Sequence, residues 1–194
     1  MAVNRHSFIV LEDHPLVLGA ITDHLSTAFP GATFAYRGAH LHEALELAHS
    51  AETTCAIVDL DLGDGRAPSD TVTRLRDADI PVVMISAHEQ ALLVQEAVHA
   101  GASAYVPKRS IIDQLAEAVS AAELQQPWLS PDFAAVLVPV EGSAVALDPL
   151  AERALVLYAA GLPSSMISAR TGIEADRVRP ILESVIQAYR SPAN

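Results

Sequence analysis

Short apolar runs alternate with amphipathic stretches along the first 124 residues of the chain. Mostly apolar runs of four or five residues occupy positions 7–11, 33–37, 55–59, 81–85 and 103–106. Runs of this length are typical of strands, and the more continuous ones suit burial on both faces of a parallel sheet. The pattern therefore predicts five strands in one parallel sheet.

The stretches between these strands repeat apolar residues at helical spacing. Leu18, Ile21 and Leu25 recur every three or four positions after a proline that suits the first turn of a helix. Ser110 is the expected N-cap of the fifth helix. The first predicted helix begins at Pro15. The other four cover 40–49, about 70–77, 90–99 and 110–124. This alternation predicts a doubly wound α/β domain over residues 1–124.

Residues 125–146 are rich in turn-forming residues and are predicted to be a linker. The linker contains one short helix, 132–137, with Ser130 as its N-cap and Pro131 in its first position. Residues 147–194 predict three helices, over 149–160, 164–170 and a segment from about 174. Two short helices joined by a glycine-containing turn, followed by a third, indicate a small all-α helix-turn-helix domain.

Polar side chains stand where the predicted strands end. Glu12 and Asp13 follow the first strand, Asp59 ends the third, Ser86 follows the fourth, and Lys108 lies just past the fifth. Because these ends share one edge of a parallel sheet, the side chains can converge. Carboxylates close together repel each other unless a cation lies between them, and such oxygen ligands suit Mg²⁺. A hydroxyl and an ammonium beside them could bind a phosphoryl group.

Charge is spread unevenly along the chain. The net charge is -12, yet residues 147–194 carry five acids and five arginines, so the first 146 residues hold the whole deficit. An acidic first domain argues against nucleic-acid binding there. Lys108 is the only lysine. The single Cys55, the lack of a secretory leader and the lack of an apolar run of about 20 residues predict a cytoplasmic protein without a membrane span.

The acidic pair, the aspartate, the Ser-Ala and the Tyr-x-x-Lys at successive strand ends resemble the receiver domain of bacterial response regulators. The resemblance covers residues 7–124 and implies a flavodoxin-like fold whose phosphoacceptor is Asp59. It also implies Mg²⁺ as cofactor and a sensor histidine kinase as partner. The implied metal ligands are Glu12, Asp13, Asp59 and the backbone carbonyl of Asp61. The implied phosphoryl-binding and switch residues are Ser86, Lys108 and Tyr105.

The segment Pro-Trp-Leu-Ser-Pro at 127–131 is similar to one that follows receivers of the NarL/FixJ type. Ala-Gly-Leu-Pro-Ser and Ile-Ser-Ala-Arg-Thr-Gly-Ile, at 160–164 and 167–173, resemble the LuxR-type DNA-binding domain. The DNA contacts that this resemblance implies are Arg170, Arg177 and Arg179. The third helix departs from the family because Pro180 favours a kink and two apolar residues, 181 and 182, stand where polar contacts are expected. A fourth helix, through which the family usually dimerises, is not expected before the last residue, 194.

These observations predict a two-domain response regulator. Phosphorylation of Asp59 would drive homodimerisation and switch the C-terminal domain to bind duplex DNA and regulate transcription. Such a protein is not an enzyme beyond its own phosphorylation and dephosphorylation.

Two alternatives remain open. In the first, residues 147–194 bind a protein partner rather than DNA, which their neutral charge and apolar third helix favour. In the second, the chain is a phosphatase of the haloacid dehalogenase type, since Asp59-Leu60-Asp61 matches that family's Asp-x-Asp. That motif belongs on the first strand, however, whereas here it lies on the third.

Overall fold

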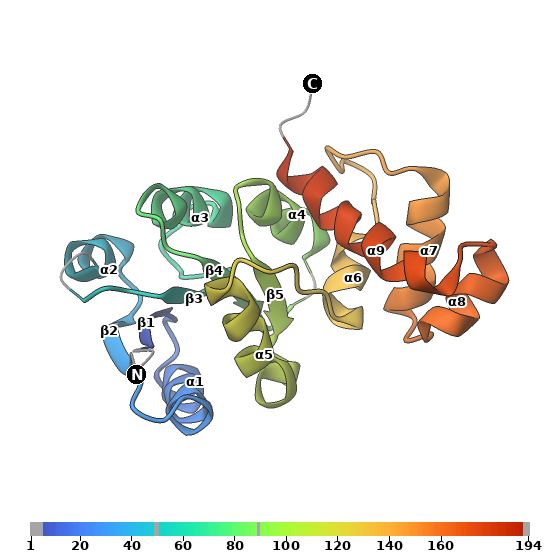
Figure 1. Cartoon of the computed structure of the whole chain (residues 1–194). Coiled ribbons are helices and arrows are strands. Elements are labelled where there is room, and N and C mark those ends of the chain that lie inside the picture. Colours follow the sequence, from blue (N-terminus) through green and yellow to red (C-terminus); the bar gives the residue numbers. More distant parts are fainter. Residues whose placement is uncertain (1–5, 49–50, 89, 192–194) are drawn as a thin grey trace.

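The first domain is a five-stranded parallel sheet between two layers of helices, seen in the computed structural model in Figure 1. The structure describes residues 6–48, 51–88 and 90–191. The strand order is β2-β1-β3-β4-β5. The strands are β1 (Ser7–Leu11), β2 (Thr33–Gly38), β3 (Cys55–Asp59), β4 (Val82–Ser86) and β5 (Ala104–Pro107). The predicted doubly wound sheet is therefore confirmed.

Helices cover both faces of the sheet, with α1 and α5 on one side and α2, α3 and α4 on the other (Figure 1). A short 3₁₀ turn, η1 (Lys108–Ser110), joins β5 to α5. The helices are α1 (Pro15–Ala28), α2 (Leu41–Ala48), α3 (Pro68–Asp77), α4 (Ala91–His99) and α5 (Ile111–Glu123). Across the described residues, no helix has the length and apolar character needed to cross a bilayer.

The apolar runs of the sequence become the buried strands of the sheet, including β5 at one edge. Every residue of β1, β3, β4 and β5 is buried, whereas β2 is half-exposed at the edge. Burying an aliphatic or aromatic side chain contributes about 1.5–3 kcal/mol, so these strands form the main core. The weaker pattern of the second strand matches its edge position.

The segment that the sequence predicts as a linker is packed rather than extended. Its helix α6 (Pro131–Leu137) begins where expected, because the Ser130 hydroxyl accepts a hydrogen bond from the Phe133 amide at 3.1 Å. Trp128, Phe133 and Leu137 are buried, and the two aromatic rings stack with centroids 6.4 Å apart. The segment thus joins the two parts of the chain into one continuous core.

Residues 147–191 of the C-terminal region form three helices, as expected. They are α7 (Pro149–Ala159), α8 (Ser164–Thr171) and α9 (Ala175–Arg190). Gly172 adopts φ +79° between α8 and α9, a conformation that glycine reaches without strain. Pro180 does not interrupt α9. A buried stripe holds this helix along its length, formed by Val178, Leu182, Val185, Ile186 and Tyr189.

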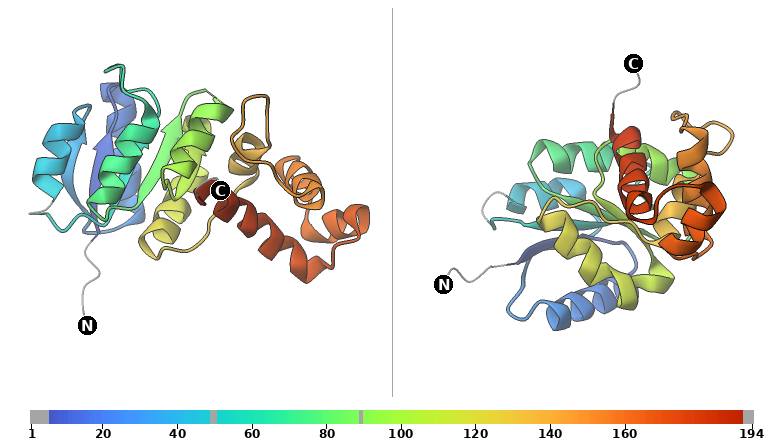
Figure 2. Two further views of the ribbon diagram at one scale, coloured as in Figure 1. Left: turned by 90° about the horizontal axis from the view of Figure 1, so that it is seen from above. Right: turned by 45° about the vertical axis from the view of Figure 1, so that its right-hand side comes forward.

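The last turn of α9 docks on the first domain beside α4, a contact that the sequence does not predict (Figures 1 and 2). The backbone carbonyl of Tyr189 lies 2.9 Å from His99 Nδ1 of α4. The Tyr189 hydroxyl donates to the carbonyl of Leu137 at 2.8 Å. A single residue near the C-terminal end of α9 therefore contacts both α4 and α6.

Ser110 occupies the predicted N-cap position of α5, but its side chain does not cap the helix. Its hydroxyl donates to Asp132 Oδ2 at 3.0 Å instead. The Asp132 carboxylate, at the start of α6, accepts two more hydrogen bonds, from Arg109 at 2.8 Å and from Gln114 at 2.9 Å. We call this arrangement the Asp132 clasp. It takes the hydroxyl away from the local backbone and ties η1 and α5 to α6.

Candidate functional site

The carboxyl ends of β1, β3 and β5 bring four of the predicted residues together. Glu12 and Asp13 follow β1, Asp59 ends β3, and Lys108 follows β5. Lys108 Nζ lies 2.7 Å from Asp59 Oδ2 and 2.7 Å from Glu12 Oε2. Glu12 and Asp59 are 1% and 5% exposed, so one ammonium pairs with two buried carboxylates. The only lysine of the chain therefore lies at the centre of an acidic site.

The electrostatics of this group follow from its burial. Burial raises the pKa of Asp59, and the hydrogen bond from Lys108 opposes this only in part. Burial alone would lower the pKa of Lys108, but its hydrogen bonds with Asp59 and Glu12 outweigh burial, so that pKa is raised. Lys108 therefore stays charged, while a second cation near Asp59 would favour the ionised carboxylate further.

The same edge of the sheet can hold a metal ion. Among the described residues, ligand atoms of Glu12, Asp13, His14 and Asp59 all lie within 4.8 Å of one another. Three of the four are carboxylates, which fit the oxygen preference of Mg²⁺. Gly63, with φ +68°, lies beside Asp13, and an added Cβ would lie 3.4 Å from Asp13 Oδ2. The predicted carboxylate ligands thus lie together, in a donor set that suits Mg²⁺.

His14 is a member of this group that sequence reasoning missed. Its Nδ1 lies 2.6 Å from Asp13 Oδ1 and 3.2 Å from Glu12 Oε1. The charge of Asp13, followed by hydrogen bonds with Glu12 and Asp13, raises the pKa of His14. The position of His14 directly after Glu12 and Asp13 was the feature of the sequence that could have identified it.

Asp61, whose backbone carbonyl was predicted as a metal ligand, lies in the loop after β3. Its backbone amide hydrogen-bonds to the carboxylate of Asp59, and its own Oδ1 accepts from the Gly63 amide at 3.0 Å. These bonds hold the loop against the phosphoacceptor candidate. The role of the carbonyl itself stays a prediction.

Ser86 lies at the end of β4 and Tyr105 lies in β5, as predicted. The contacts described here for these two side chains lie outside the acidic group. The Ser86 hydroxyl donates to the carbonyl of His88 at 2.8 Å and accepts from its amide at 3.1 Å. Tyr105 is 1% exposed, and its ring centroid lies 6.3 Å from that of Phe133. Ser86 thus braces the β4–α4 loop, and Tyr105 faces inward against α6.

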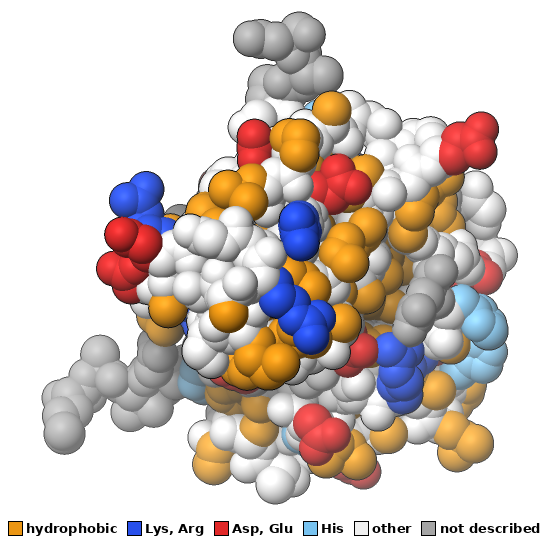
Figure 3. Space-filling model, turned by 90° about the vertical axis from the view of Figure 1, so that its right-hand side faces the viewer, with side chains coloured by type: hydrophobic (Ala, Val, Ile, Leu, Met, Phe, Trp, Pro, Cys, Tyr) orange, Lys and Arg blue, Asp and Glu red, His pale blue; other side chains and the backbone are white. Residues whose placement is uncertain are grey.

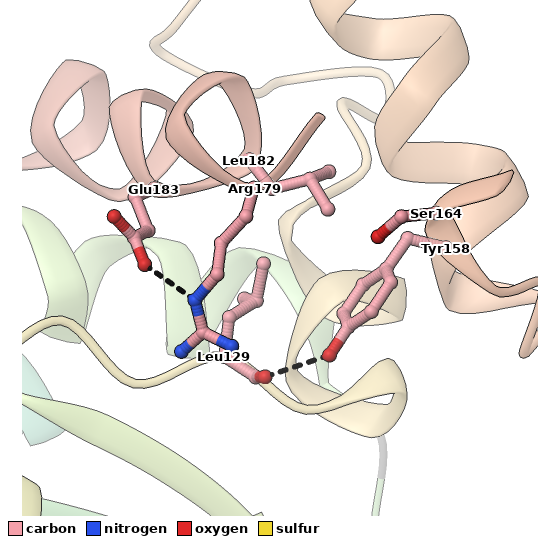
Figure 4. A pocket seen from close by; sticks show the side chains of 6 residues that line it. All are labelled: Leu129, Tyr158, Ser164, Arg179, Leu182 and Glu183. Atoms are coloured by element: carbon pink, nitrogen blue, oxygen red, sulfur yellow. Dashed lines mark hydrogen bonds and ion pairs between the residues drawn. The ribbon is translucent and has the colours of Figure 1, made fainter. Parts of the chain in front are cut away.

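The three arginines predicted to contact DNA differ in their surroundings. Arg170 on α8 and Arg177 on α9 are exposed. Arg179 on α9 is exposed as well, and its Nε lies 2.9 Å from Glu183 Oε1. The pair lies beside a small pocket that Leu129, Tyr158, Ser164 and Leu182 also line (Figure 4). The face formed by the C-terminal helices carries a few basic side chains among many hydrophobic ones (Figure 3). The basic surface is therefore small.

Comparison with known proteins assigns the family. Residues 8–120 match the model of the response regulator receiver domain, so the chain belongs to the response regulator family. This match replaces the interpretation of Asp59 and Asp61 as a haloacid-dehalogenase motif. That motif belongs on the first strand, whereas Asp59 ends β3. A comparison with curated proteins gives no match.

Solved structures share the whole architecture. The RcsB response regulator of Salmonella typhimurium is similar over 99% of this chain and 95% of its own, with 14% identity and a TM-score of 0.63. The RcsB–DNA complex is similar over 98% and 95%, with 13% identity and a TM-score of 0.63. A LuxR-family two-component response regulator from Aurantimonas sp. SI85-9A1 has 25% identity over 68% of this chain and 94% of its own, with a TM-score of 0.60. The fold is thus that of a receiver with a helical C-terminal region.

Proposed function

We propose that a sensor histidine kinase phosphorylates this response regulator on Asp59 in a Mg²⁺-dependent step. The observation that carries the proposal is the convergence of Glu12, Asp13, Asp59 and Lys108 at one edge of the sheet. A protein with this role acts in the cytoplasm and catalyses only its own phosphorylation and dephosphorylation.

The chemistry is a phosphoryl transfer between two side chains. An Asp59 carboxylate oxygen attacks the phosphorus of the kinase phosphohistidine, the P–N bond breaks, and the electron pair stays on the imidazole nitrogen. Glu12, Asp13 and Asp59 would hold Mg²⁺, which neutralises phosphoryl oxygens when bound. Lys108 then exchanges its contact with Asp59 Oδ2 for one with a phosphoryl oxygen. Ser86 leaves the β4–α4 loop to donate to another.

These movements reach α6 by two routes. Lys108 begins η1, so its shift acts on the next two residues, which hold the Asp132 clasp. Ser86 ends β4, which pairs with β5, so its movement reaches Tyr105, whose buried ring packs on Phe133 of α6. Because α6 packs against α7, both routes end in the C-terminal domain.

The output we propose is transcriptional control by a phosphorylation-dependent homodimer on duplex DNA. Two similar structures are an RcsB–DNA complex and two RcsB dimers bound to two parallel DNAs. In this chain, Arg170 and Arg177 are exposed and available for phosphates. The C-terminal region has no net charge, these arginines included, so affinity would depend on pairing two protomers.

The protein-partner alternative loses one of its two supports, the apolar third helix. Leu182, one of the apolar residues that favoured it, is 4% exposed and belongs to the internal stripe of α9. Ile181 is half-buried beside it. The apolar character of α9 therefore has an internal explanation.

The test is treatment of the full chain with acetyl phosphate and Mg²⁺, followed by intact-mass measurement. We expect a gain of one phosphoryl mass that is lost with a chelator or with Asp59→Asn. Asp64→Asn, an exposed carboxylate in the following loop, is the control and should label normally. Equal labelling of Asp59→Asn would reject the assignment.

A further inference from the structure

A positively charged pocket lies at the opposite end of the sheet from Asp59, where the last turn of α9 meets the receiver. It has a volume of about 250 Å³. Its polar side chains come from four separate segments and are Arg76, Ser103, Gln125, Gln126 and Arg190. The residues that line it include no acid, although the chain as a whole carries 24 acids and a net charge of -12.

Arg190, the last residue of α9, is fixed in this pocket by the start of β5. Its Nη2 donates to the carbonyls of Ala102 at 3.0 Å and Ser103 at 3.1 Å. Its Nε is buried and, in the described part of the chain, has no hydrogen-bond partner. A buried donor without an acceptor is costly, and more so on a charged group. The guanidinium is therefore immobilised by these two carbonyls, and one of its buried donors is left unsatisfied.

Arg76, near the end of α3, supplies a second guanidinium. Gly101 has φ +108°, and a Cβ there would lie 3.3 Å from Arg76 Cγ, so the glycine lets the arginine stem lie against the loop. Burial and the charge of Arg76 both lower the pKa of Arg190. No ion pair to a carboxylate involves either arginine among residues 6–48, 51–88 and 90–191. An anion between them would relieve this repulsion.

We propose that this pocket binds a small oxyanion, the phosphate or carboxylate group of a metabolite, between Arg76 and Arg190, and that the bound anion clamps α9 onto the receiver. Guanidinium groups present paired N–H donors that match both kinds of oxyanion. The volume is slightly below the roughly 300 Å³ at which pockets for drug-sized ligands begin, which suits a small metabolite. Because the two arginines belong to the receiver and to α9, occupancy opposes release of α9.

The experiment titrates inorganic phosphate and citrate separately into the full chain, in metal-depleted buffer at constant ionic strength. Calorimetry measures binding, and hydrogen exchange measures protection of the last turn of α9. We expect saturable binding of at least one probe, which Arg76→Gln and Arg190→Gln each weaken roughly tenfold or more. Arg74→Gln, an exposed arginine in the same turn of α3 that does not line the pocket, should bind like the wild type.

The outcomes separate the parts of the proposal. Binding of phosphate alone assigns a phosphoryl-bearing ligand, and binding of citrate alone assigns a carboxylate. Arg190→Gln also removes bonds to the β5 loop, so Arg76→Gln, which leaves those bonds intact, decides the site. Equal binding by Arg76→Gln, or no saturable binding of either probe, overturns the site. Unchanged exchange in α9 on saturation overturns the clamp.

Discussion

The ring of Tyr105 in β5 lies 6.3 Å, centroid to centroid, from the ring of Phe133 in α6. Tyr105 is 1% exposed and Phe133 is fully buried, so each ring forms part of the other's packing. Protein interiors are close-packed, and a tyrosine that turns cannot do so without displacing its neighbour. The proposed switch residue is therefore coupled to the segment between the domains by direct contact.

Phe133→Leu tests this coupling. The smaller side chain should lower the free energy of unfolding by about 1–2 kcal/mol, because packing is lost without a full cavity. Labelling of Asp59 by acetyl phosphate should be unchanged, while the phosphorylation-dependent rise in dimer fraction should shrink. Urea unfolding and light scattering measure the two effects. Phe34→Leu, on the edge strand, is the control, and an unaltered dimer response in Phe133→Leu would contradict the coupling.

The Asp132 clasp is the second connection between the site and α6. Asp132→Ala removes the acceptor for Arg109, Ser110 and Gln114. It should lower the free energy of unfolding by only about 1 kcal/mol, because the Asp132 carboxylate is partly exposed. The phosphorylated protein should still form but should differ less from the unphosphorylated one in hydrogen exchange of α6. Asp113→Ala removes an exposed carboxylate from the first turn of α5 and serves as the control. Equal effects of the two substitutions would rule out a special role for the clasp.

The raised pKa of Asp59 predicts the pH dependence of stability without Mg²⁺. Burial raises this pKa above its ordinary 3.8, so the ionised carboxylate destabilises the native state relative to the unfolded one. Stability is therefore lost as the pH rises above 3.8 through the raised value. Asp59→Asn should be more stable than the wild type at neutral pH, and the difference should shrink as the pH falls toward 3.8.

Urea unfolding across this pH range in metal-depleted buffer measures the difference. Asp23→Asn on α1 removes an exposed carboxylate and should show no comparable gain. A less stable Asp59→Asn at neutral pH would mean that the pairing with Lys108 outweighs the burial of the carboxylate.

The sheet and most of the acidic site could be predicted from the sequence, because few arrangements of strands and helices are compatible with its pattern of apolar and polar residues. Buried runs of five residues must form central strands, and parallel strands end at one edge, so polar residues after them must converge. Asp59 and Lys108, 49 positions apart, lie 2.7 Å from each other for this reason. The prediction needed only strand order, which topology restricts strongly.

The choice of partner by each side chain could not be predicted in the same way. Ser110 and Ser86 each have several acceptors within reach, and the tertiary fold decides that they bond to Asp132 and to the β4–α4 loop. The DNA contact of Arg179 stays a prediction, and the side chain also pairs with a glutamate one turn away. The docking of α9 on the receiver depends on surfaces that meet only after both parts have folded.

The ion pair of Arg179 with Glu183 leads to the last prediction, which concerns DNA. Arg179 Nε lies 2.9 Å from Glu183 Oε1, so this acid occupies one of the few basic groups on α9. Each phosphate neutralised by a cation adds about 0.9 to the slope of log affinity against log salt. With so few exposed arginines, we expect the slope for the phosphorylated full chain to be shallow, no steeper than about -3 per protomer.

Glu183→Gln should free Arg179 and steepen this slope by about one phosphate, or 0.9, with higher affinity at low salt. Arg177→Ala should make the slope shallower by a similar amount, because Arg177 is exposed on the same helix. The measurement is titration of a random-sequence duplex by the phosphorylated full chain at several salt concentrations. Glu152→Gln on α7 makes the same change in net charge away from the ion pair and is the control. An equal steepening by Glu152→Gln would attribute the effect to net charge alone, and no effect of Arg177→Ala would remove α9 from the DNA surface.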